Sequence, residues 1–360
     1  MIALIPIALV LLFVISPMGC YLSRAGWEEA KILRGRKPIA EVIADRRTDS
    51  LTRAKLALVV DARRFAIDSL GLDAKKSFTQ YTRLEHDTLV LLLSAAQRDR
   101  LVQHTWWFPI VGRVPYKGYF DFGAARAAAK DFERREYDVY LRPASAFSTL
   151  GFFNDPLLST TLRGDSINLA STVIHELTHN TFYAKGQAIF NESFAEFVGA
   201  RGASWLFRSR GQPAAADVVE ARWADDRVLS AFWERLYRTL DSALKAHPES
   251  KAARLAVRDT IYAQARRTLI EEVGPQMKAV SPRYMERVRL DNAALLARRV
   301  YSTDLSTFER VFRHEGHDLR RTVSRIVALG KANAKDPFAA LRSWSDEQDR
   351  AVTTPARTFP

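Results

Sequence analysis

The sequence predicts an α+β protein that is mainly helical, with a small N-terminal sheet region packed on a helical body. Helical periodicity runs through almost every window after residue 166, whereas residues 21–165 mix helical and strand-like segments. A content of 47% apolar and 26% charged residues is typical of globular proteins. We expect four parts, which are a leader at 1–20, a mixed half at 21–165, a helical half at 166–345 and a tail at 346–360.

Apolar spacing and the positions of glycine and proline define the expected elements. Helices are predicted at 24–36, which ends near Gly35, and at 51–70, which ends at Gly71. Further along, the patterns predict a buried strand at 88–93, strand and turn at 106–122, a helix at 123–136, a strand at 137–141 and a loop at 143–165. The C-terminal helices are expected to break at 211–213, 247–248, 274–275 and 281–282.

The apolar leader ends at the single cysteine of the chain. Residues 1–19 carry no charged side chain and Gly19 precedes Cys20, a pattern that looks like a bacterial lipoprotein signal with Cys20 lipidated. An uncleaved anchor helix is an alternative, because about 20 apolar residues span a bilayer. The third interpretation is that the leader is a plain buried helix and that its cysteine is incidental. The first two place the body in the cell envelope, held at a membrane on the periplasmic or extracellular face.

Charge and cysteine content narrow the functional classes. The 54 Lys and Arg against 41 Asp and Glu leave a net charge of +13, but the basic residues are scattered in ones and twos without a nucleic-acid-binding module. We therefore expect no nucleic-acid partner. One cysteine permits no intramolecular disulfide, so a metal ion would be held by histidines and carboxylates.

The segment STVIHELTHNTFY (171–183) contains an HExxH pattern. Histidines four apart on a helix differ by about 40° around its axis, so His175 and His179 project from one face. That geometry suits two positions of a zinc ion, and Glu176 would lie beside the ion, where it can accept a proton from bound water. A helix whose histidines only fill space is the alternative.

A second apolar helix follows with two carboxylates on one face, Glu192 and Glu196. Glu192 can be the third metal ligand from an antiparallel neighbour, and Glu196 can accept a hydrogen bond from the other nitrogen of a ligand histidine. Carboxylates on an apolar helix are costly to bury without a cation. An ordinary exposed helix face remains the alternative.

These motifs also carry a family resemblance. HELTHNTFY followed by NESFAE looks like the gluzincin zinc peptidases, whose third ligand is the Glu of an Asn-Glu motif on the next helix. Residues 19 to about 320 resemble a bacterial family described as membrane-anchored aminopeptidases, most clearly in the blocks WWFPIVGRVPYKGYFD (106–121), FSTLGFFNDPLLST (147–160), IHELTHNTFY (174–183) and FNESFAEFVG (190–199). The resemblance implies a zinc peptidase acting on peptide substrates, with His175, His179 and Glu192 as ligands, Glu176 as general base and Glu196 orienting a ligand.

The resemblance also implies groups that bind substrate. Gluzincins align substrate on an edge strand before the HExxH helix, and the matching positions here are Ala146, Phe147, Ser148, Thr149, Leu150 and Gly151. An oxyanion needs a donor besides the metal, and Tyr301 is the first candidate, followed by His314 and His317. Each of the three also has a structural alternative. Tyr301 can be an ordinary half-buried tyrosine, and His314 and His317 can be surface histidines. The remaining histidines, His86, His104 and His247, are expected to be structural or exposed.

The sequence thus predicts a membrane-anchored zinc peptidase, with aminopeptidase as the first reading. Because no GxMEN-type aminopeptidase block is present, a zinc endopeptidase acting on envelope proteins or peptides is an alternative. A catalytically inactive envelope lipoprotein that uses the site for binding is the other.

Overall fold

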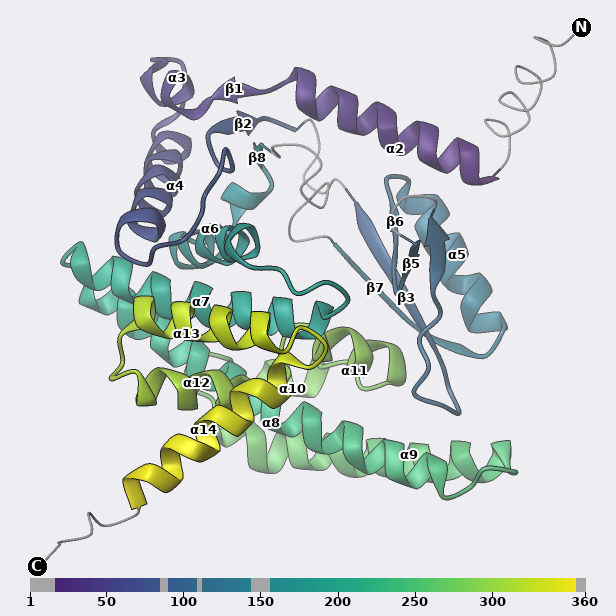
Figure 1. Ribbon diagram of the computed structural model, residues 1–360. Coiled ribbons are helices and arrows are strands. Elements are labelled where there is room, and N and C mark those ends of the chain that lie inside the picture. The colour runs from purple at the N-terminus through teal and green to yellow at the C-terminus, as the bar shows by residue number, and fades with distance from the viewer. Residues whose placement is uncertain (1–16, 85–89, 109–111, 144–155, 354–360) are drawn as a thin grey trace, which may run out of the picture.

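The computed structural model describes residues 17–84, 90–108, 112–143 and 156–353, and in them the chain is α+β and mainly helical (Figure 1). This confirms the predicted fold class. The strands are short: β1 (Lys37–Pro38), β2 (Gln80–Thr82), β3 (Leu91–Gln97), β4 (Trp106–Phe108), β5 (Gly112–Val114), β6 (Lys117–Tyr119), β7 (Tyr137–Pro143) and β8 (Leu157–Leu158). The α-helices are α2 (Pro17–Arg34), α3 (Ile39–Ala44), α4 (Ser50–Asp68), α5 (Phe122–Arg134), α6 (Ser166–Thr181), α7 (Ala188–Ser209), α8 (Pro213–Lys245), α9 (Lys251–Thr268), α10 (Pro282–Arg287), α11 (Asn292–Arg299), α12 (Leu305–His314), α13 (Leu319–Ala332) and α14 (Pro337–Thr353).

Most predicted elements are present, with two shifts. The described part of helix α2 runs from Pro17, so this helix already includes residues before the predicted start at residue 24. Strand β3 continues past the predicted end at residue 93 to Gln97, because it pairs with β7 as far as Gln97 opposite Tyr137. All four predicted breaks lie at junctions of the C-terminal helices: Pro213 and Pro282 are the first residues of α8 and α10, residues 247–248 lie between α8 and α9, and residues 274–275 lie in a short 3-10 helix between α9 and α10.

A three-stranded antiparallel sheet in the order β6-β3-β7 forms one side of the molecule, and α5 covers it (Figure 1). Leu93 and Val139 of the sheet pack with Phe132 of α5 in a small apolar cluster. Strand β7 ends next to the helical body, which places Arg142 near the candidate site described below. A second sheet, β1-β2-β8, and the hairpin β4-β5 complete the strands that the described residues form.

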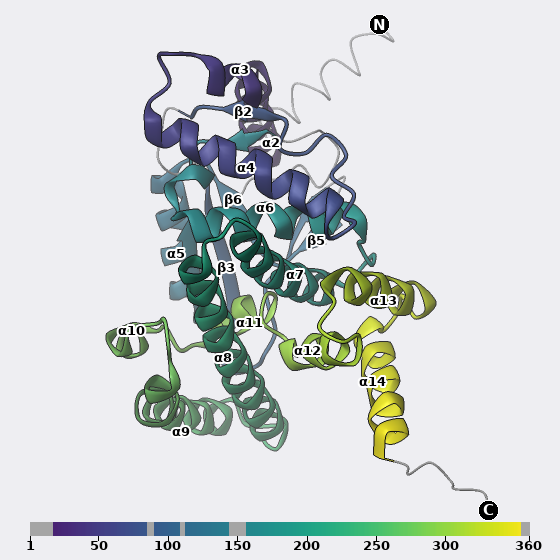
Figure 2. The same cartoon turned by 90° about the vertical axis from the view of Figure 1, so that its left-hand side faces the viewer.

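The helical body is built around α6 and α7. Helix α4 packs against α6 from one side and α8 against α7 from the other, while α12, α13 and α14 group together at the far end of α7 (Figure 2). Large side chains fill this core, among them Phe190, Phe194, Phe197 and Phe308, all fully buried. Together they fix α7 against its neighbours, so the polar face of α7 is held in a defined position.

The membrane anchor predicted for the leader falls largely on residues 1–16, outside the described residues. Cys20 lies in α2. Within the described ranges, no helix combines the length and the apolar character needed to cross a bilayer.

Candidate metal centre

Helix α6 carries the HExxH segment in its last turns. The helix starts where Asp165 caps it by accepting a hydrogen bond from the Asn168 N–H at 2.8 Å. One face of α6 is fully buried through Val173, Ile174 and Leu177. Because the histidines lie on the remaining face, burial of this apolar stripe directs both imidazoles toward α7.

Helices α6 and α7 approach each other closely at Gly199. A Cβ atom at this position would lie 2.8 Å from the carbonyl oxygen of Ser171 and 3.2 Å from the Cβ of His175. Only glycine fits there without moving one helix. The contact therefore sets the distance between the helix that carries the histidines and the helix that carries Glu192.

The turn between the two helices is held by Asn191. Its side-chain Oδ1 accepts from the Ala184 N–H and its Nδ2 donates to the Ala184 carbonyl, both at 2.8 Å. Asn191 is buried, so these bonds satisfy polar groups that water does not reach. This amide bridge fixes the start of α7, and Glu192 is the next residue.

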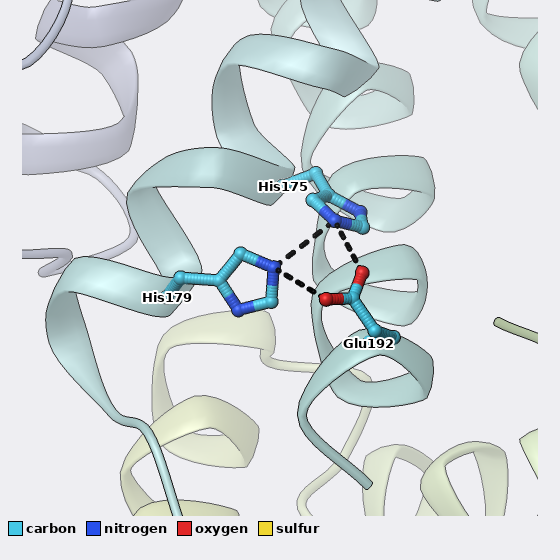
Figure 3. Close-up of side chains that lie close together, drawn as sticks. All are labelled: His175, His179 and Glu192. Atoms are coloured by element: carbon cyan, nitrogen blue, oxygen red, sulfur yellow. Dashed lines mark hydrogen bonds and ion pairs between the residues drawn. The ribbon is translucent and has the colours of Figure 1, made fainter. Parts of the chain in front are cut away.

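Three side chains converge between the helices (Figure 3). The Nε2 atoms of His175 and His179 are 3.2 Å apart. The Glu192 carboxylate points its Oε2 at the Nε2 of His175, 3.4 Å away, and its Oε1 at the Nε2 of His179, 3.6 Å away. The three residues could together hold a metal ion. The structure thus brings together all three residues that the sequence predicted as ligands.

Electrostatics at this triad favour a cation. Burial disfavours a charge on His175, but the contact with Glu192 and the charges of Glu196 and Glu176 outweigh it and raise the pKa of His175 to about 9. Burial also acts against the Glu192 carboxylate, yet its contacts with His175 and His179 lower its pKa to about 2. In the absence of a metal ion, His175 is therefore protonated at pH 7. The surroundings that stabilise this positive charge would also stabilise a bound metal cation.

The other two carboxylates of the motifs surround His175. Glu196 Oε1 lies 3.7 Å from the Nδ1 of His175, longer than a hydrogen bond but on the nitrogen that faces away from the triad. Glu176 is half-buried on α6 and its charge acts on both His175 and Glu196. The corresponding Nδ1 of His179 is buried and has no hydrogen-bond partner among the described residues.

Tyr301 lies near the triad together with two residues that sequence reasoning missed. Reduced hydration and the charge of Glu192 raise the pKa of both Tyr301 and Tyr116. The Arg142 guanidinium lies 5.7 Å from the centre of the Tyr301 ring. Tyr116 falls inside the block 106–121 that carried the family resemblance, so that block contained a signal for it. Arg142, the residue after the predicted strand at 137–141, had no such signal.

A cavity of about 280 Å³ is lined by Glu196, the neighbour of His175, and by Tyr301, Arg142 and Asp226, among others. Asp226, on α8, was also missed from the sequence. Reduced hydration and the negative charges of Glu196 and Asp225 raise the pKa of Asp226 to about 7, against an opposing effect of Arg222. Two carboxylates, Glu196 and Asp226, and two arginines, Arg142 and Arg298, thus line the cavity.

The other predicted candidates lie elsewhere or cannot be placed. His314 lies 2.7 Å from Asp349 of α14, and His317 packs on Phe312, so the C-terminal helices engage both. His104 sits in an aromatic cluster, and its pKa is lowered mainly by burial and further by the charges of nearby arginines. His247 is exposed. The predicted aligning strand at 146–151 and His86 lie outside the described residues.

Comparison with known protein families gives a match over most of the chain. The model of a family described as "Putative aminopeptidase" matches residues 20–341, which include every residue of the triad and of the adjoining cavity. No curated protein and no solved structure matches the chain. Because the family model spans most of the chain and the triad lies inside it, the protein belongs to this aminopeptidase family.

Proposed function

We propose that the protein is a zinc-dependent peptidase in which His175, His179 and Glu192 hold the ion. The observation that carries the proposal is the convergence of the donor atoms. The two Nε2 atoms are 3.2 Å apart, and each faces a different oxygen of the Glu192 carboxylate, at 3.4 Å for His175 and 3.6 Å for His179. One ligand atom from each residue lies within 4.8 Å of the other two. Ligand atoms bound at about 2.0–2.1 Å to a tetrahedral zinc ion lie about 3.3–3.4 Å from each other. Two histidines and one glutamate are also a donor set of catalytic zinc sites, which keep a fourth position for water.

In this proposal, different residues of the chain perform different steps of the reaction. A zinc ion in this site would polarise the scissile carbonyl and acidify a water molecule. Glu176 accepts a proton from the attacking water and passes it to the leaving amine. Tyr301 donates a hydrogen bond to the oxyanion, and Arg142 supports it by lying against the tyrosine ring. Glu196 orients the imidazole of His175 through its Nδ1 atom.

Metal content tests the ligand set. Purified wild-type protein is expected to carry about one zinc per chain, and Glu192→Ala to lose it because two ligands bind zinc weakly. Glu249→Ala, which removes an exposed carboxylate between α8 and α9, is the matched control and should keep its zinc. Zinc in Glu192→Ala at the wild-type level would refute the ligand assignment.

Turnover tests the general base separately. Glu176→Gln should keep its zinc and lose turnover by several orders of magnitude, because the amide cannot accept the proton. Substantial remaining activity in this variant would refute the role of Glu176. Failure of the wild-type protein to hydrolyse any peptide while holding zinc would favour the alternative of an inactive binding protein.

The family description favours an aminopeptidase over an endopeptidase. A panel of amino-acid anilides and N-blocked peptides separates the two, because an aminopeptidase requires a free α-amine. We expect hydrolysis of the anilides. Cleavage confined to N-blocked peptides would instead assign an endopeptidase of envelope proteins or peptides.

We further propose that the protein is held at a membrane of the cell envelope, facing the periplasm or the exterior, through lipidated Cys20 or through the apolar segment 1–19. The uncharged leader that ends at the lone cysteine supports this proposal. Incorporation of radiolabelled palmitate should occur in the wild-type protein and be absent from Cys20→Ala. Labelling of Cys20→Ala would exclude lipidation of Cys20. Release of both the wild-type protein and Cys20→Ala from membranes by a salt wash would exclude both the lipid anchor and the helical anchor.

A further inference from the structure

Helix α2 presents an exposed side next to the apolar leader. The uncharged residues 1–16 lead directly into its first turn. Its C-terminal half is fixed to the body at Ile32, which is buried and whose carbonyl accepts a hydrogen bond from the Oγ1 of Thr82 at 2.9 Å. Nearer its N-terminus, Arg24 lies 3.5 Å from Asp121. Figure 1 shows α2 along the edge of the molecule opposite α9 and α14, so the side of α2 away from Ile32 is turned outward.

The outward side of α2 includes the position of the lone cysteine. Residues seven apart on an α-helix differ by only about 20° around its axis, so position 20 shares a face with Trp27. The exposed residues within about 60° of position 20 form the outer face of α2, which consists of Ser23, Arg24, Trp27, Lys31 and Arg34. None of them is acidic. Ile32, which faces the body, lies about 120° around the axis from position 20.

The tryptophan of this face is placed as in a membrane interface. Trp27 is 57% exposed, although a tryptophan ring is largely apolar. Tryptophan is enriched where a membrane meets water, because its ring is apolar and its N–H is polar. Trp27 lies about 10 Å along the helix from position 20. A chain held at a membrane through position 20 would therefore keep this ring at the level of the lipid headgroups.

The charge of the same region favours an anionic surface. Residues 20–37 contain five basic and two acidic side chains, which leaves 5 − 2 = +3. Lys31 pairs with Glu28 at 3.3 Å, but 51% of its side chain is exposed, and surface pairs of this kind contribute little energy. Arg34 makes no hydrogen bond or ion pair with the part of the chain that the structure describes. Basic side chains next to a membrane anchor are attracted to anionic lipids.

We propose that the outer face of α2 rests on an anionic bilayer surface, with Trp27 in the headgroup region. This inference rests on the proposed membrane anchor and not on the peptidase activity. A single acyl chain binds a membrane only weakly, and a basic segment beside it makes the attachment stable. The contact also orients the molecule, because it places α2 against the bilayer and α9 and α14 at the edge away from it (Figure 2).

Quenching by brominated lipids tests the proposal on the full-length, anchored protein. The protein is reconstituted in vesicles of phosphatidylcholine alone and of an equimolar mixture with phosphatidylglycerol, with bromine atoms on the acyl chains near the headgroup. We expect quenching of tryptophan emission in the anionic vesicles and loss of that quenching in Trp27→Phe. Equal quenching in the wild-type protein and Trp27→Phe, or none in either, would overturn the proposal.

Trp107→Phe is the matched control. Trp107 of β4 is exposed to nearly the same extent, 56%, but does not lie on α2. The variant should keep the quenching of the wild-type protein. Loss of quenching in Trp107→Phe together with its retention in Trp27→Phe would place the bilayer against β4 and overturn the proposal.

A second pair of variants tests the charge. Each basic residue near an anionic surface strengthens binding by about fivefold, so Lys31→Gln/Arg34→Gln should need more phosphatidylglycerol for the same Trp27-dependent quenching. Arg238→Gln/Lys245→Gln removes one arginine and one lysine that form surface pairs on α8 and should behave as the wild-type protein. Equal effects of the two double variants would overturn an anionic surface as the partner of α2.

Membrane association separates this inference from the anchor on which it rests. Release of the wild-type protein from membranes by a salt wash would overturn the proposed anchor. A protein that stays in the membrane fraction while Trp27 is not quenched would overturn only this inference.

Discussion

Gly199→Ala should weaken zinc binding although it changes no ligand. An added Cβ would lie 2.8 Å from the carbonyl oxygen of Ser171 in α6. Unstrained carbon–oxygen contacts begin at about 3.3 Å, so α6 and α7 would have to separate locally by about 0.5 Å. Metal sites tolerate deviations of only about 0.2 Å in ligand distance. The movement occurs one turn from His175, so we expect zinc affinity to fall by about tenfold or more, as for lost supporting contacts.

The same substitution should also reduce stability. Overpacking a core contact costs about 1–3 kcal/mol, and replacing a helical glycine by alanine returns up to about 1 kcal/mol. We therefore expect a net loss of about 1–2 kcal/mol in the free energy of unfolding of the metal-free protein. Urea unfolding measures this loss, and competition with a chelator measures the zinc affinity.

Gly202→Ala is the matched control on the same helix. Its Cβ would meet side-chain carbons, at 2.9 Å from the Cδ1 of Leu70 and 3.0 Å from the Cγ2 of Ile174. Side chains can adjust by rotation, whereas a backbone carbonyl moves only with its helix. We expect a similar loss of stability but an unchanged zinc affinity. Equal zinc affinities in the two variants would refute the reasoning that the contact at Gly199 sets the ligand geometry.

Three further predictions follow from the site. Zinc binding at pH 7 should release about one proton, because the pKa of His175 is raised to about 9 in the metal-free protein and a ligand imidazole must be neutral. Calorimetry in buffers of different ionisation enthalpy measures this proton release. The release should vanish well above pH 9, where the His175 imidazole is already neutral. Tyr301→Phe should lower kcat about 10²–10³-fold with its zinc retained, and an unchanged kcat in steady-state assays would exclude Tyr301 as the oxyanion donor. Asn191→Ala should cost about 2–4 kcal/mol in urea unfolding, because the N–H and carbonyl of Ala184 lose their buried partner; a cost below about 1 kcal/mol would show that water replaces the amide bridge.

The sequence was sufficient for the features that depend on local spacing. The four-residue interval between His175 and His179 determines that both rings share a helix face, whatever the rest of the fold. The same interval places Glu196 one turn beyond Glu192. The predicted breaks at glycine and proline also matched the ends of helices, because these residues act on the backbone of their own segment.

The start and end of individual elements were less well predicted. Helix α2 already includes Pro17, seven residues before the predicted start at residue 24. Strand β3 extends to Gln97 because its partner β7 continues opposite it. Strand length depends on pairing with a distant segment, which the apolar pattern of one segment does not contain.

The amino-acid sequence by itself determined the helical class, the HExxH helix and the chemistry of a two-histidine, one-glutamate site. Only the tertiary structure decided that Asp226 and Arg142 reach the cavity beside that site and that Gly199 sets the separation of the two helices. The physical reason is the range of the interactions. Helix periodicity acts between residues a few positions apart, whereas the meeting of α7, α8 and β7 depends on how whole apolar faces pack together.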